Sequence, residues 1–210
     1  MKIMELAEQN RFICGRAFAR RRGRTFFPEP SRTDRGSLMS GRDLPYRPCV
    51  GVALFNPEGL VWIGRRADKP NDEGKGLWWQ MPQGGIDEGE DPRTAALREL
   101  AEETGVKSAR IIAEAPDWYT YDLPEHLIGK AWGGRYRGQK QKWYAALLDG
   151  PEEEIDISGH GHPPEFDAWR WAPLQELPEL IVPFKRGVYE QVVEAFRDVP
   201  ERIRAGEFKS

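Results

Sequence analysis

The sequence is poor in cysteine, because Cys14 and Cys49 are the only thiols in its 210 residues. Small secreted domains that depend on disulfide bonds carry several cysteines. Two cysteines far apart in the chain predict no such framework and fit a reducing compartment. We therefore expect a cytoplasmic protein.

Long apolar runs are also missing. A helix that crosses a membrane needs about 18 or more consecutive apolar residues, and no stretch of this sequence provides them. The N-terminal region likewise lacks the apolar segment of a secretory signal peptide. The sequence therefore predicts no association with a membrane.

The sequence has no overall excess of positive charge. Its 31 Lys and Arg residues face 34 Asp and Glu residues, which gives a net charge of −3 and a pI of about 5.8. A protein that binds nucleic acid through its bulk charge is expected to be basic. We therefore expect no DNA binding, and any contact with RNA has to be local.

Positive charge is concentrated near the N-terminus, where residues 1–45 contain ten Lys and Arg against five Asp and Glu. The segment Arg16–Arg35 shows little periodicity, which predicts a disordered basic extension. Three interpretations remain open: an arm that binds RNA, an organelle transit peptide, or a start codon assigned too early. We favour the third, with Met39 as the start. Acidic residues such as Glu5 count against a transit peptide.

The rest of the chain has the length of one globular domain, which we place at residues 46–200, followed by a charged tail at 201–210. Apolar runs at 49–56 and 60–66 flank a Pro-Glu-Gly turn and predict a β-hairpin. Residues 67–76 form a polar loop. Further strands are expected at 77–82, 111–118, 119–124, 138–150 and 167–171, and an amphipathic helix at 183–196.

A helix is predicted from Pro92 to Thr104. Asp91 is a suitable N-cap, proline is favoured at the first helical position, and Gly105 is a typical residue to end a helix. The segment between is rich in Ala, Leu, Glu and Arg, which are strong helix formers. This helix would place three glutamates on one of its faces.

Glu99, Glu102 and Glu103 lie at positions i, i+3 and i+4 of this helix, so their carboxylates share one face. Such clustering of like charge is explained by a divalent cation, because carboxylate oxygens suit Mg²⁺ and Mn²⁺, which act on phosphates. The alternative is an ordinary solvated acidic face. The three glutamates alone do not decide between the two.

The spacing around the glutamates does decide. Five residues separate Gly84 from Glu90 and seven separate Glu90 from Arg98, after which the chain reads RELAEETGV up to Val106. This pattern resembles a complete Nudix box over residues 84–106. The resemblance implies a mixed β-sheet between helices, an α/β/α arrangement in which the box forms a loop, a helix and a loop. It also implies hydrolysis of a nucleoside diphosphate linked to another group.

The resemblance further implies roles for residues of the box. Glu99, Glu102 and Glu103 correspond to the glutamates that hold Mg²⁺, Mn²⁺ or another divalent cation, and one of them acts as the base. Arg98 resembles the arginine that orients them, with Glu90 as its ion-pair partner. The glycines Gly84, Gly85 and Gly105 are expected to allow backbone geometry that a Cβ atom would block.

Outside the box, the resemblance narrows to one branch of the family. The motifs are YRPCVG, WWQMPQGGIDEGE, GQKQKWY, PEFDAWRW and PFKRGVY. Together they resemble bacterial RNA pyrophosphohydrolases, which also carry the label of dinucleoside polyphosphate hydrolases. The similarity extends from about residue 46 to 197. The loop 67–76 is longer than in the enterobacterial form, and residues 125–137 are harder to align.

Additional site residues follow from this resemblance. Glu165 in the PEFD motif is expected to approach the metals as a fourth carboxylate, the alternative being an exposed loop glutamate. Candidates for contacts with the polyphosphate, the RNA backbone and the base are Arg47, Arg66, Gln80, Lys140, Phe184 and Lys185. From the residues alone, Phe184 would be a core residue and Lys185 a basic helix start.

Other residues that attract attention have simpler interpretations. Trp78 and Trp79 are typical of a core rather than a ligand platform. His160 and His162 form a His-x-His pair, but they lie among Gly and Pro with no partner cysteine. We expect no zinc site there.

The expected function is metal-dependent hydrolysis of the 5′-triphosphate or 5′-diphosphate end of RNA to a 5′-monophosphate, which would initiate mRNA decay. One alternative is the same chemistry on a dinucleoside polyphosphate. Another is a non-catalytic module that binds nucleotides or RNA, which the complete set of box glutamates argues against. We expect a monomer or a small oligomer.

Overall fold

A computed structural model describes residues 43–67, 78–159 and 163–209 of the chain. The predictions for the basic extension up to residue 42, for Met39, for most of the loop 67–76 and for His160 and His162 lie outside these residues. Within them, no helix has the length and apolar character that a membrane span requires.

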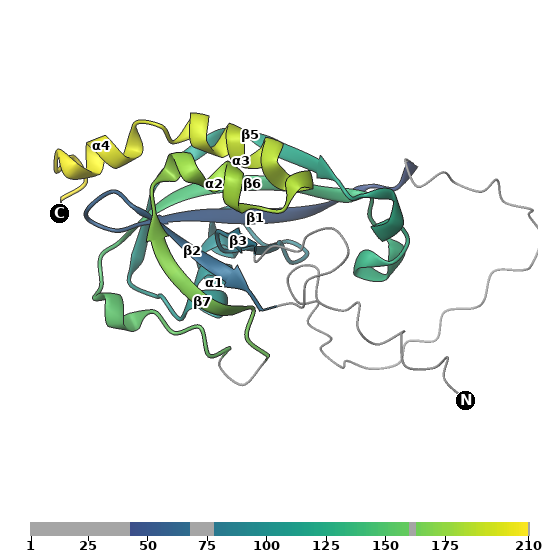
Figure 1. The fold of residues 1–210 in the computed structure, drawn as a ribbon, viewed down its shortest axis with the longest axis horizontal. Coiled ribbons are helices and arrows are strands. Elements are labelled where there is room, and N and C mark those ends of the chain that lie inside the picture. The colour runs from purple at the N-terminus through teal and green to yellow at the C-terminus, as the bar shows by residue number, and fades with distance from the viewer. Residues whose placement is uncertain (1–42, 68–77, 160–162, 210) are drawn as a thin grey trace, which may run out of the picture.

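One mixed sheet forms the centre of the molecule (Figure 1). Its strands are β1 (Tyr46–Phe55), β2 (Val61–Arg66), β3 (Trp79–Gln80), β4 (Gln83–Gly85), β5 (Ala109–Asp122), β6 (Gly138–Leu148) and β7 (Phe166–Ala172). The order is β3-β2-β1-β6-β5, with β4 paired to β1 and β7 to β2. The pair β1–β6 is parallel and the other pairs are antiparallel. The predicted hairpin of β1 and β2 is confirmed.

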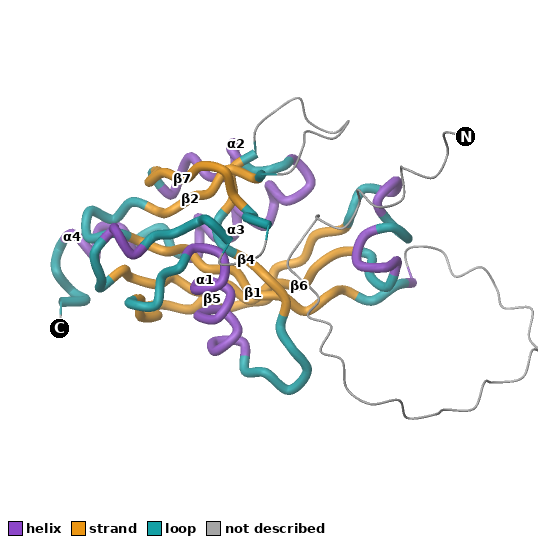
Figure 2. Tube along the Cα trace, turned by 90° about the horizontal axis from the view of Figure 1, so that it is seen from below, coloured by secondary structure: helices purple, strands orange, loops and turns teal. Residues whose placement is uncertain are grey.

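Helices cover both faces of this sheet, which confirms the α/β/α arrangement (Figures 1 and 2). The helices are α1 (Pro92–Thr104), α2 (Leu177–Leu180), α3 (Arg186–Ala195) and α4 (Val199–Arg204). On one face, Ala96 and Leu100 of α1 pack with alternate residues of β1 and β6 such as Val52. On the other, Tyr189 and Val192 of α3 pack with the intervening strand residues. Successive side chains of each strand therefore point alternately into two separate hydrophobic cores, one on each face of the sheet.

β5 is long and irregular. Its pairing with β6 shifts between Ile111 and Ala113 and again between Glu114 and Trp118. Pro116 lies in the second shift and has no N–H to give to the ladder, which is a sufficient reason for the interruption. The chain then makes two 3₁₀ turns, at Glu125–Leu127 and Ala131–Gly134, before β6 returns. This excursion projects beyond the end of the sheet (Figure 2).

The C-terminal region differs from the prediction in two ways. The expected helix over 183–196 is a 3₁₀ turn at Pro183–Lys185 followed by α3, so Phe184 and Lys185 precede the α-helix. The sequence predicts only a charged tail from residue 201, but α4 extends to Arg204. Val199 and Ile203 are spaced by four residues and are both buried. Their apolar contacts with the core order a segment whose composition is mostly charged.

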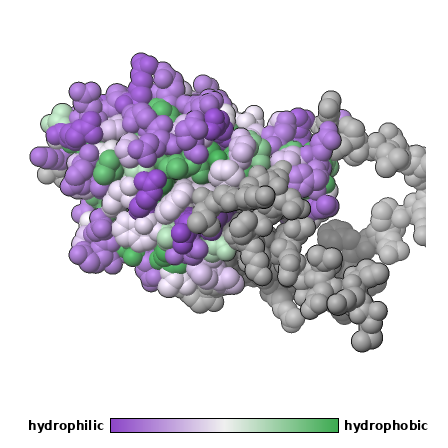
Figure 3. Space-filling model, in the orientation of Figure 1, coloured by the Kyte–Doolittle hydropathy of each residue, from purple (hydrophilic) through white to green (hydrophobic). Residues whose placement is uncertain are grey.

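The outer surface is mostly polar, because the two cores enclose most of the large hydrophobic side chains. The face drawn in Figure 3 is largely hydrophilic, and hydrophobic residues show only in small groups. Among the described residues, Leu97 and Trp118 are the large hydrophobic side chains that are clearly exposed.

Candidate active site

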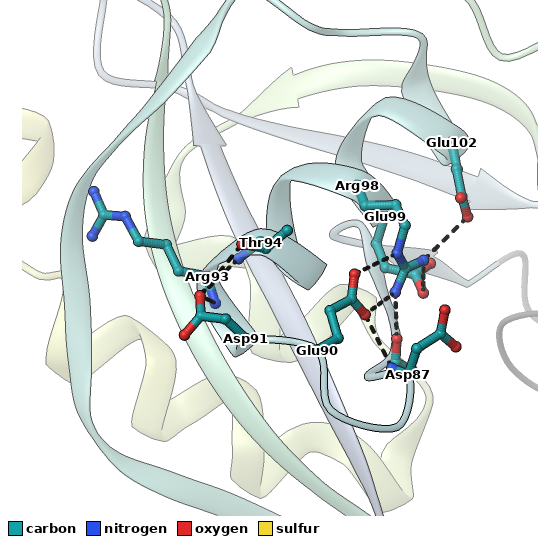
Figure 4. A network of polar contacts seen from close by, with 9 residues as sticks. Asp87, Glu90, Asp91, Arg93, Thr94, Arg98, Glu99 and Glu102 are labelled. Atoms are coloured by element: carbon teal, nitrogen blue, oxygen red, sulfur yellow. Dashed lines mark hydrogen bonds and ion pairs between the residues drawn. The ribbon is translucent and has the colours of Figure 1, made fainter.

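The helix α1 begins and ends as its sequence predicts. Asp91 accepts hydrogen bonds from the backbone N–H groups of Arg93 (3.0 Å) and Thr94 (3.1 Å), as Figure 4 shows. Gly105 ends the helix with a left-handed φ of 76°, which a glycine adopts at little cost. These two caps fix where the helix begins and ends, and the packing of Ala96 and Leu100 against the sheet sets the side to which its glutamates point.

Arg98 is the centre of the polar network on this helix (Figure 4). Its Nε and Nη2 donate to the two carboxylate oxygens of Glu90, both at 2.8 Å, and Nη2 also donates to the carbonyl oxygen of Gly85 at 2.9 Å. Its Nη1 donates to Glu99 at 2.9 Å and to Glu102 at 3.4 Å. The expected Arg98–Glu90 ion pair is present, and the same guanidinium orients two of the three box glutamates.

Gly84 and Gly85 serve this site through space and not through unusual backbone angles. A Cβ atom on Gly84 would lie 2.0 Å from the carboxylate of Glu99, and one on Gly85 would lie 2.3 Å from Nη2 of Arg47. Neither glycine has a positive φ, whereas Gly105 does. A Cβ atom is therefore unfavourable at all three positions, at Gly84 and Gly85 because of close neighbours and at Gly105 because of its φ.

Glu99 is buried and Glu103 is half-buried. Burial raises the pKa of Glu99 to about 7, although the adjacent Arg98 opposes this shift. Burial also raises the pKa of Glu103 well above its ordinary value, and the negative charges of Glu165 and Glu99 add to the effect. Oε2 of Glu103 accepts a hydrogen bond from the backbone N–H of Gln83 at 3.1 Å. Within the described residues, its Oε1 is buried without a hydrogen-bond partner.

Glu165 joins these carboxylates from a distant part of the chain. It immediately precedes β7, and its backbone oxygen accepts from the N–H of Ala67 at 2.9 Å, just after β2. Its carboxylate forms an ion pair with Arg66 at the end of β2. Because its charge acts on both Glu99 and Glu103, Glu165 belongs to the same cluster and is not an isolated loop residue.

The donor set fits a divalent cation by its chemistry. Four carboxylates gather on the α1 side of the sheet, two of them with pKa values raised by burial and by one another. Hard oxygen ligands of this kind suit Mg²⁺ and Mn²⁺. As placed, no three acidic, histidine or cysteine side chains of the described residues form a ready set of ligands. Arg98, Arg66 and the N–H of Gln83 hold the carboxylates instead.

A second polar cluster lies on the opposite, α3 side of the sheet. Oε1 of Gln83 accepts hydrogen bonds from Nε2 of Gln141 (2.8 Å) and from Nζ of Lys185 (3.3 Å). Nε2 of Gln141 also donates to Oε1 of Gln139 at 2.9 Å. All four side chains are buried. Sequence reasoning missed the three glutamines, although strand alternation in GQKQKW places Gln139 and Gln141 on one face.

Arg47 and Phe184 lie on this same side. Arg47 places its guanidinium carbon 5.8 Å from the ring centroid of Trp132, a residue with a left-handed φ of 50°. Phe184 is half-buried, packs against the α3-side core and lies 5.6 Å from the ring of Tyr121. Lys185 places Nζ 5.5 Å from the same ring. Arg47, Phe184 and Lys185 are thus brought to one face of the sheet.

Two predicted substrate residues are placed elsewhere. Lys140 is exposed, and its Nζ lies 5.4 Å from the ring of Trp118. As the residue between Gln139 and Gln141, it points to the opposite face of β6 from these glutamines and away from Lys185.

Gln80 also points to the α1 side of the sheet. It pairs with Gly64 on β2, and a Cβ atom on Gly64 would meet Phe166 of the α1-side core. Since residues directly opposite in a sheet share a face, Gln80 lies on the carboxylate side. Its Nε2 is buried without a hydrogen-bond partner in the described residues.

Trp78 and Trp79 are both half-buried. Trp79 packs against the core, as expected, with its outer surface between Arg170 (5.2 Å) and Arg65 (6.0 Å).

Comparison with known families accounts for this arrangement. Residues 45–192 match the model of the NUDIX domain. The chain belongs to the Nudix family. Residues 84–106, which carry Arg98 and the three glutamates of α1, lie within this match.

Similar Nudix proteins are found among curated bacterial sequences. An RNA pyrophosphohydrolase of Rhizobium meliloti (strain 1021) is 60% identical over 162 residues, which cover 75% of this chain and 97% of the relative. One from Mesorhizobium japonicum is 56% identical over 173 residues, covering 80% and 96%. One from Brucella ovis is 58% identical over 166 residues, covering 77% and 93%. The match thus includes nearly the whole of each relative.

A solved structure supports the Nudix fold independently. The E. coli dihydroneopterin triphosphate pyrophosphohydrolase aligns with a TM-score of 0.53 at 21% sequence identity. The alignment covers 71% of this chain and 98% of the E. coli chain. At this level of identity the likeness concerns the fold alone.

Proposed function

We propose that this protein hydrolyses the 5′-triphosphate or 5′-diphosphate end of RNA, releases pyrophosphate or phosphate, and leaves a 5′-monophosphate. The observation that carries the proposal is the position of Gln83. Its backbone binds the carboxylate cluster on one side of the sheet and its side chain binds Lys185 on the other. Gln83 therefore connects the carboxylates that would bind a metal to a lysine that would bind phosphate. The names of the curated relatives support RNA as the substrate.

In this proposal Glu99, Glu102, Glu103 and Glu165 hold the divalent cation. Mg²⁺ or Mn²⁺ bound there would polarise a phosphate oxygen and lower the pKa of a bound water. The protein supplies the orientation of these ligands. Arg98 holds Glu99 and Glu102, the N–H of Gln83 holds Glu103, and Arg66 holds Glu165. Such outer partners keep ligand carboxylates in the geometry that catalysis requires.

The α3 side receives the phosphates and the terminal base. Arg47 and Lys185 provide fixed positive charge for phosphate oxygens, and Arg66 reaches the same phosphates from the end of β2. Phe184 offers part of its ring as a stacking surface, since every base has a face that stacks on an aromatic ring. The buried Nε2 of Gln80 adds a hydrogen-bond donor on the carboxylate side. Lys140 lies on the carboxylate side of β6 beside Trp118, away from Arg47 and Lys185, so we do not group it with these phosphate-binding cations.

A dinucleoside polyphosphate is the second candidate substrate. It would use the same carboxylates and cations, and its base would stack on Phe184 in the same manner. The partial burial of Phe184 favours neither substrate, because one base is sufficient to cover the exposed part of the ring. A purely binding role is less well supported, because all the box glutamates are present and brought to one side.

A direct competition tests the proposal. Purified protein with Mg²⁺ receives 5′-triphosphorylated RNA and a diadenosine polyphosphate together, and kcat/KM is determined for each substrate. We expect the RNA to be preferred by orders of magnitude, with 5′-monophosphate RNA as the product. A preference for the dinucleotide would overturn RNA as the substrate. Absence of turnover on both, with tight binding of either, would indicate a binding module.

A further inference from the structure

Gln83 bridges the two sides of the sheet, so whatever fixes Gln83 affects both. Its N–H points at Oε2 of Glu103 (3.1 Å), and its side-chain oxygen accepts from Lys185 (3.3 Å) and Gln141 (2.8 Å). A backbone rotation at this residue would move the donor away from Glu103 and the acceptor away from Lys185 together. The pairing of β4 with β1 opposes that rotation, and α3 provides a second restraint.

The segment that carries Gln83 is held on one side by the sheet, because β4 pairs with β1 and Gln83 lies opposite Gly51. It joins β3 to β4 through Met81 and Pro82, and a proline has no N–H to donate. The carbonyl oxygen of Pro82 accepts from the N–H of Val52 at 2.9 Å. The N–H of Met81 donates to a side chain instead, the hydroxyl of Tyr189, at 3.0 Å.

Tyr189 contacts this segment twice. Besides accepting from Met81, its hydroxyl oxygen accepts a hydrogen bond from Nε2 of Gln83 at 3.3 Å. Its ring is 1% exposed and packs edge-on against Trp143, with centroids 5.6 Å apart and an interplanar angle of 76°. A ring buried in this way cannot swing, so its hydroxyl is a fixed point on α3.

We propose that Tyr189 is a positioning residue for the hydrolytic reaction. Its hydroxyl holds the Met81–Gln83 segment so that the N–H of Gln83 faces Glu103 while the amide oxygen of Gln83 faces Lys185. Through these two hydrogen bonds, α3 adds to the restraint that β1 places on β4 and so affects the carboxylates on the far side of the sheet. The proposal rests on the proposed function for its catalytic consequence, but its effect on metal binding does not depend on the identity of the substrate.

Tyr189→Phe tests the proposal, because it removes the hydroxyl and keeps the packed ring. Mn²⁺ binding to the substrate-free protein is measured by the loss of the EPR signal of free Mn²⁺. We expect affinity to fall about tenfold, the usual scale for the loss of an outer partner of a metal ligand. We also expect kcat to fall by more than KM rises, because the carboxylates are displaced while the phosphate-binding cations remain.

Tyr144→Phe is the matched control. Tyr144 is also buried in the sheet, 3% exposed, but it belongs to the α1-side core and makes no contact with Gln83. This variant should bind Mn²⁺ and turn over as the unmodified protein does. Equal losses in the two variants would overturn the proposal, because they would indicate a general effect of removing a buried hydroxyl.

Gln83→Leu provides a second, independent variant. It keeps the backbone N–H but removes the side chain through which Tyr189 holds the residue. We expect a smaller fall in Mn²⁺ affinity than in Tyr189→Phe, because the hydroxyl still accepts from the N–H of Met81. Adding Tyr189→Phe should lower the affinity further, to the level of Tyr189→Phe alone. Unchanged Mn²⁺ affinity in both single variants would overturn the proposal. Normal Mn²⁺ behaviour of the unmodified protein without RNA turnover would instead overturn the proposed function.

Discussion

Arg98 and Glu90 form a two-point ion pair, in which Nε and Nη2 each lie 2.8 Å from a separate carboxylate oxygen. Glu90 also accepts from the backbone N–H of Asp87 at 3.0 Å, so the loop before α1 fixes the acceptor. The paired arginine then has Nη1 left to reach Glu99 and Glu102. A planar guanidinium with several donors can make all these contacts at once, which a lysine cannot do.

Arg98→Lys should therefore reduce kcat/KM by about 10-fold to 100-fold, because the ligand carboxylates lose their common anchor. Arg93→Lys is the control on the same helix, since Arg93 is exposed and its side chain makes only a weak contact with the backbone oxygen of Ile111 at 3.4 Å. Steady-state kinetics of both variants on triphosphorylated RNA provide the measurement. A harmless Arg98→Lys would contradict the anchoring role.

Glu103→Gln should lower kcat by at least about a hundredfold while the protein remains folded. The amide has the shape of the carboxyl group but cannot provide an anionic ligand. Because burial already raises the pKa of Glu103, a neutral group is tolerated there and the thermal midpoint should not fall. Glu153→Gln, on an exposed 3₁₀ turn, serves as the control. Near-normal turnover by Glu103→Gln would remove Glu103 from the metal site.

The metal-free protein should lose stability as pH rises. The pKa of Glu99 is about 7 in the folded state and 4.5 ordinarily, so the folded state binds more protons between these values. The free energy of unfolding then falls with rising pH across that interval, and the raised pKa of Glu103 acts in the same direction. Urea titrations in the presence of a chelator, at several pH values from about 5 to about 8, measure the effect.

Two further measurements test whether Glu99 causes this pH dependence of stability. Glu99→Gln should reduce the dependence, because one of the two carboxyl groups with a raised pKa is gone while Glu103 remains. Mg²⁺ should stabilise the protein most at the upper end of the interval, because it binds the ionised carboxylates. A slope that persists unchanged in Glu99→Gln would assign it to another group.

Gly84→Ala should disrupt the carboxylate cluster. The new methyl group would lie 2.0 Å from the Glu99 carboxylate, which has to move, so Mn²⁺ affinity and turnover should both fall. Gly187→Ala is the control, because nothing lies within 4 Å of its Cβ position in α3. That change should leave activity intact and stabilise the protein by about 0.4–1 kcal/mol. Normal Mn²⁺ binding by Gly84→Ala would show that Glu99 is dispensable.

Lys185→Met should raise KM for triphosphorylated RNA by at least about tenfold, since a hydrogen bond from a charged group is lost while the side-chain volume is kept. Lys140→Ala should stay within about twofold of the unmodified protein, because Lys140 lies on the opposite face beside Trp118. The reverse result would show that the substrate follows the other face of the sheet.

Local sequence was sufficient to predict α1 and its three glutamates. Asp91, Pro92 and Gly105 act within a few residues of the helix ends, and the spacing of Glu99, Glu102 and Glu103 follows from the period of an α-helix. The hairpin of β1 and β2 depends on a turn of the same local kind. For α4 local composition was misleading, because Val199 and Ile203 are ordered by contacts with a core that is distant in sequence.

By itself, then, the sequence determined the box helix, its caps and the acidic face, since these depend on periodicity and on neighbouring residues. Tertiary structure alone decided which side chains meet that face. Glu165 reaches it only because β7 pairs with β2, and Gln83 connects it to Lys185 only because β4 lies between α1 and α3. Arg66 and Glu165 are 99 residues apart in the chain. Contacts over such separations depend on strand register, and no local pattern encodes that register.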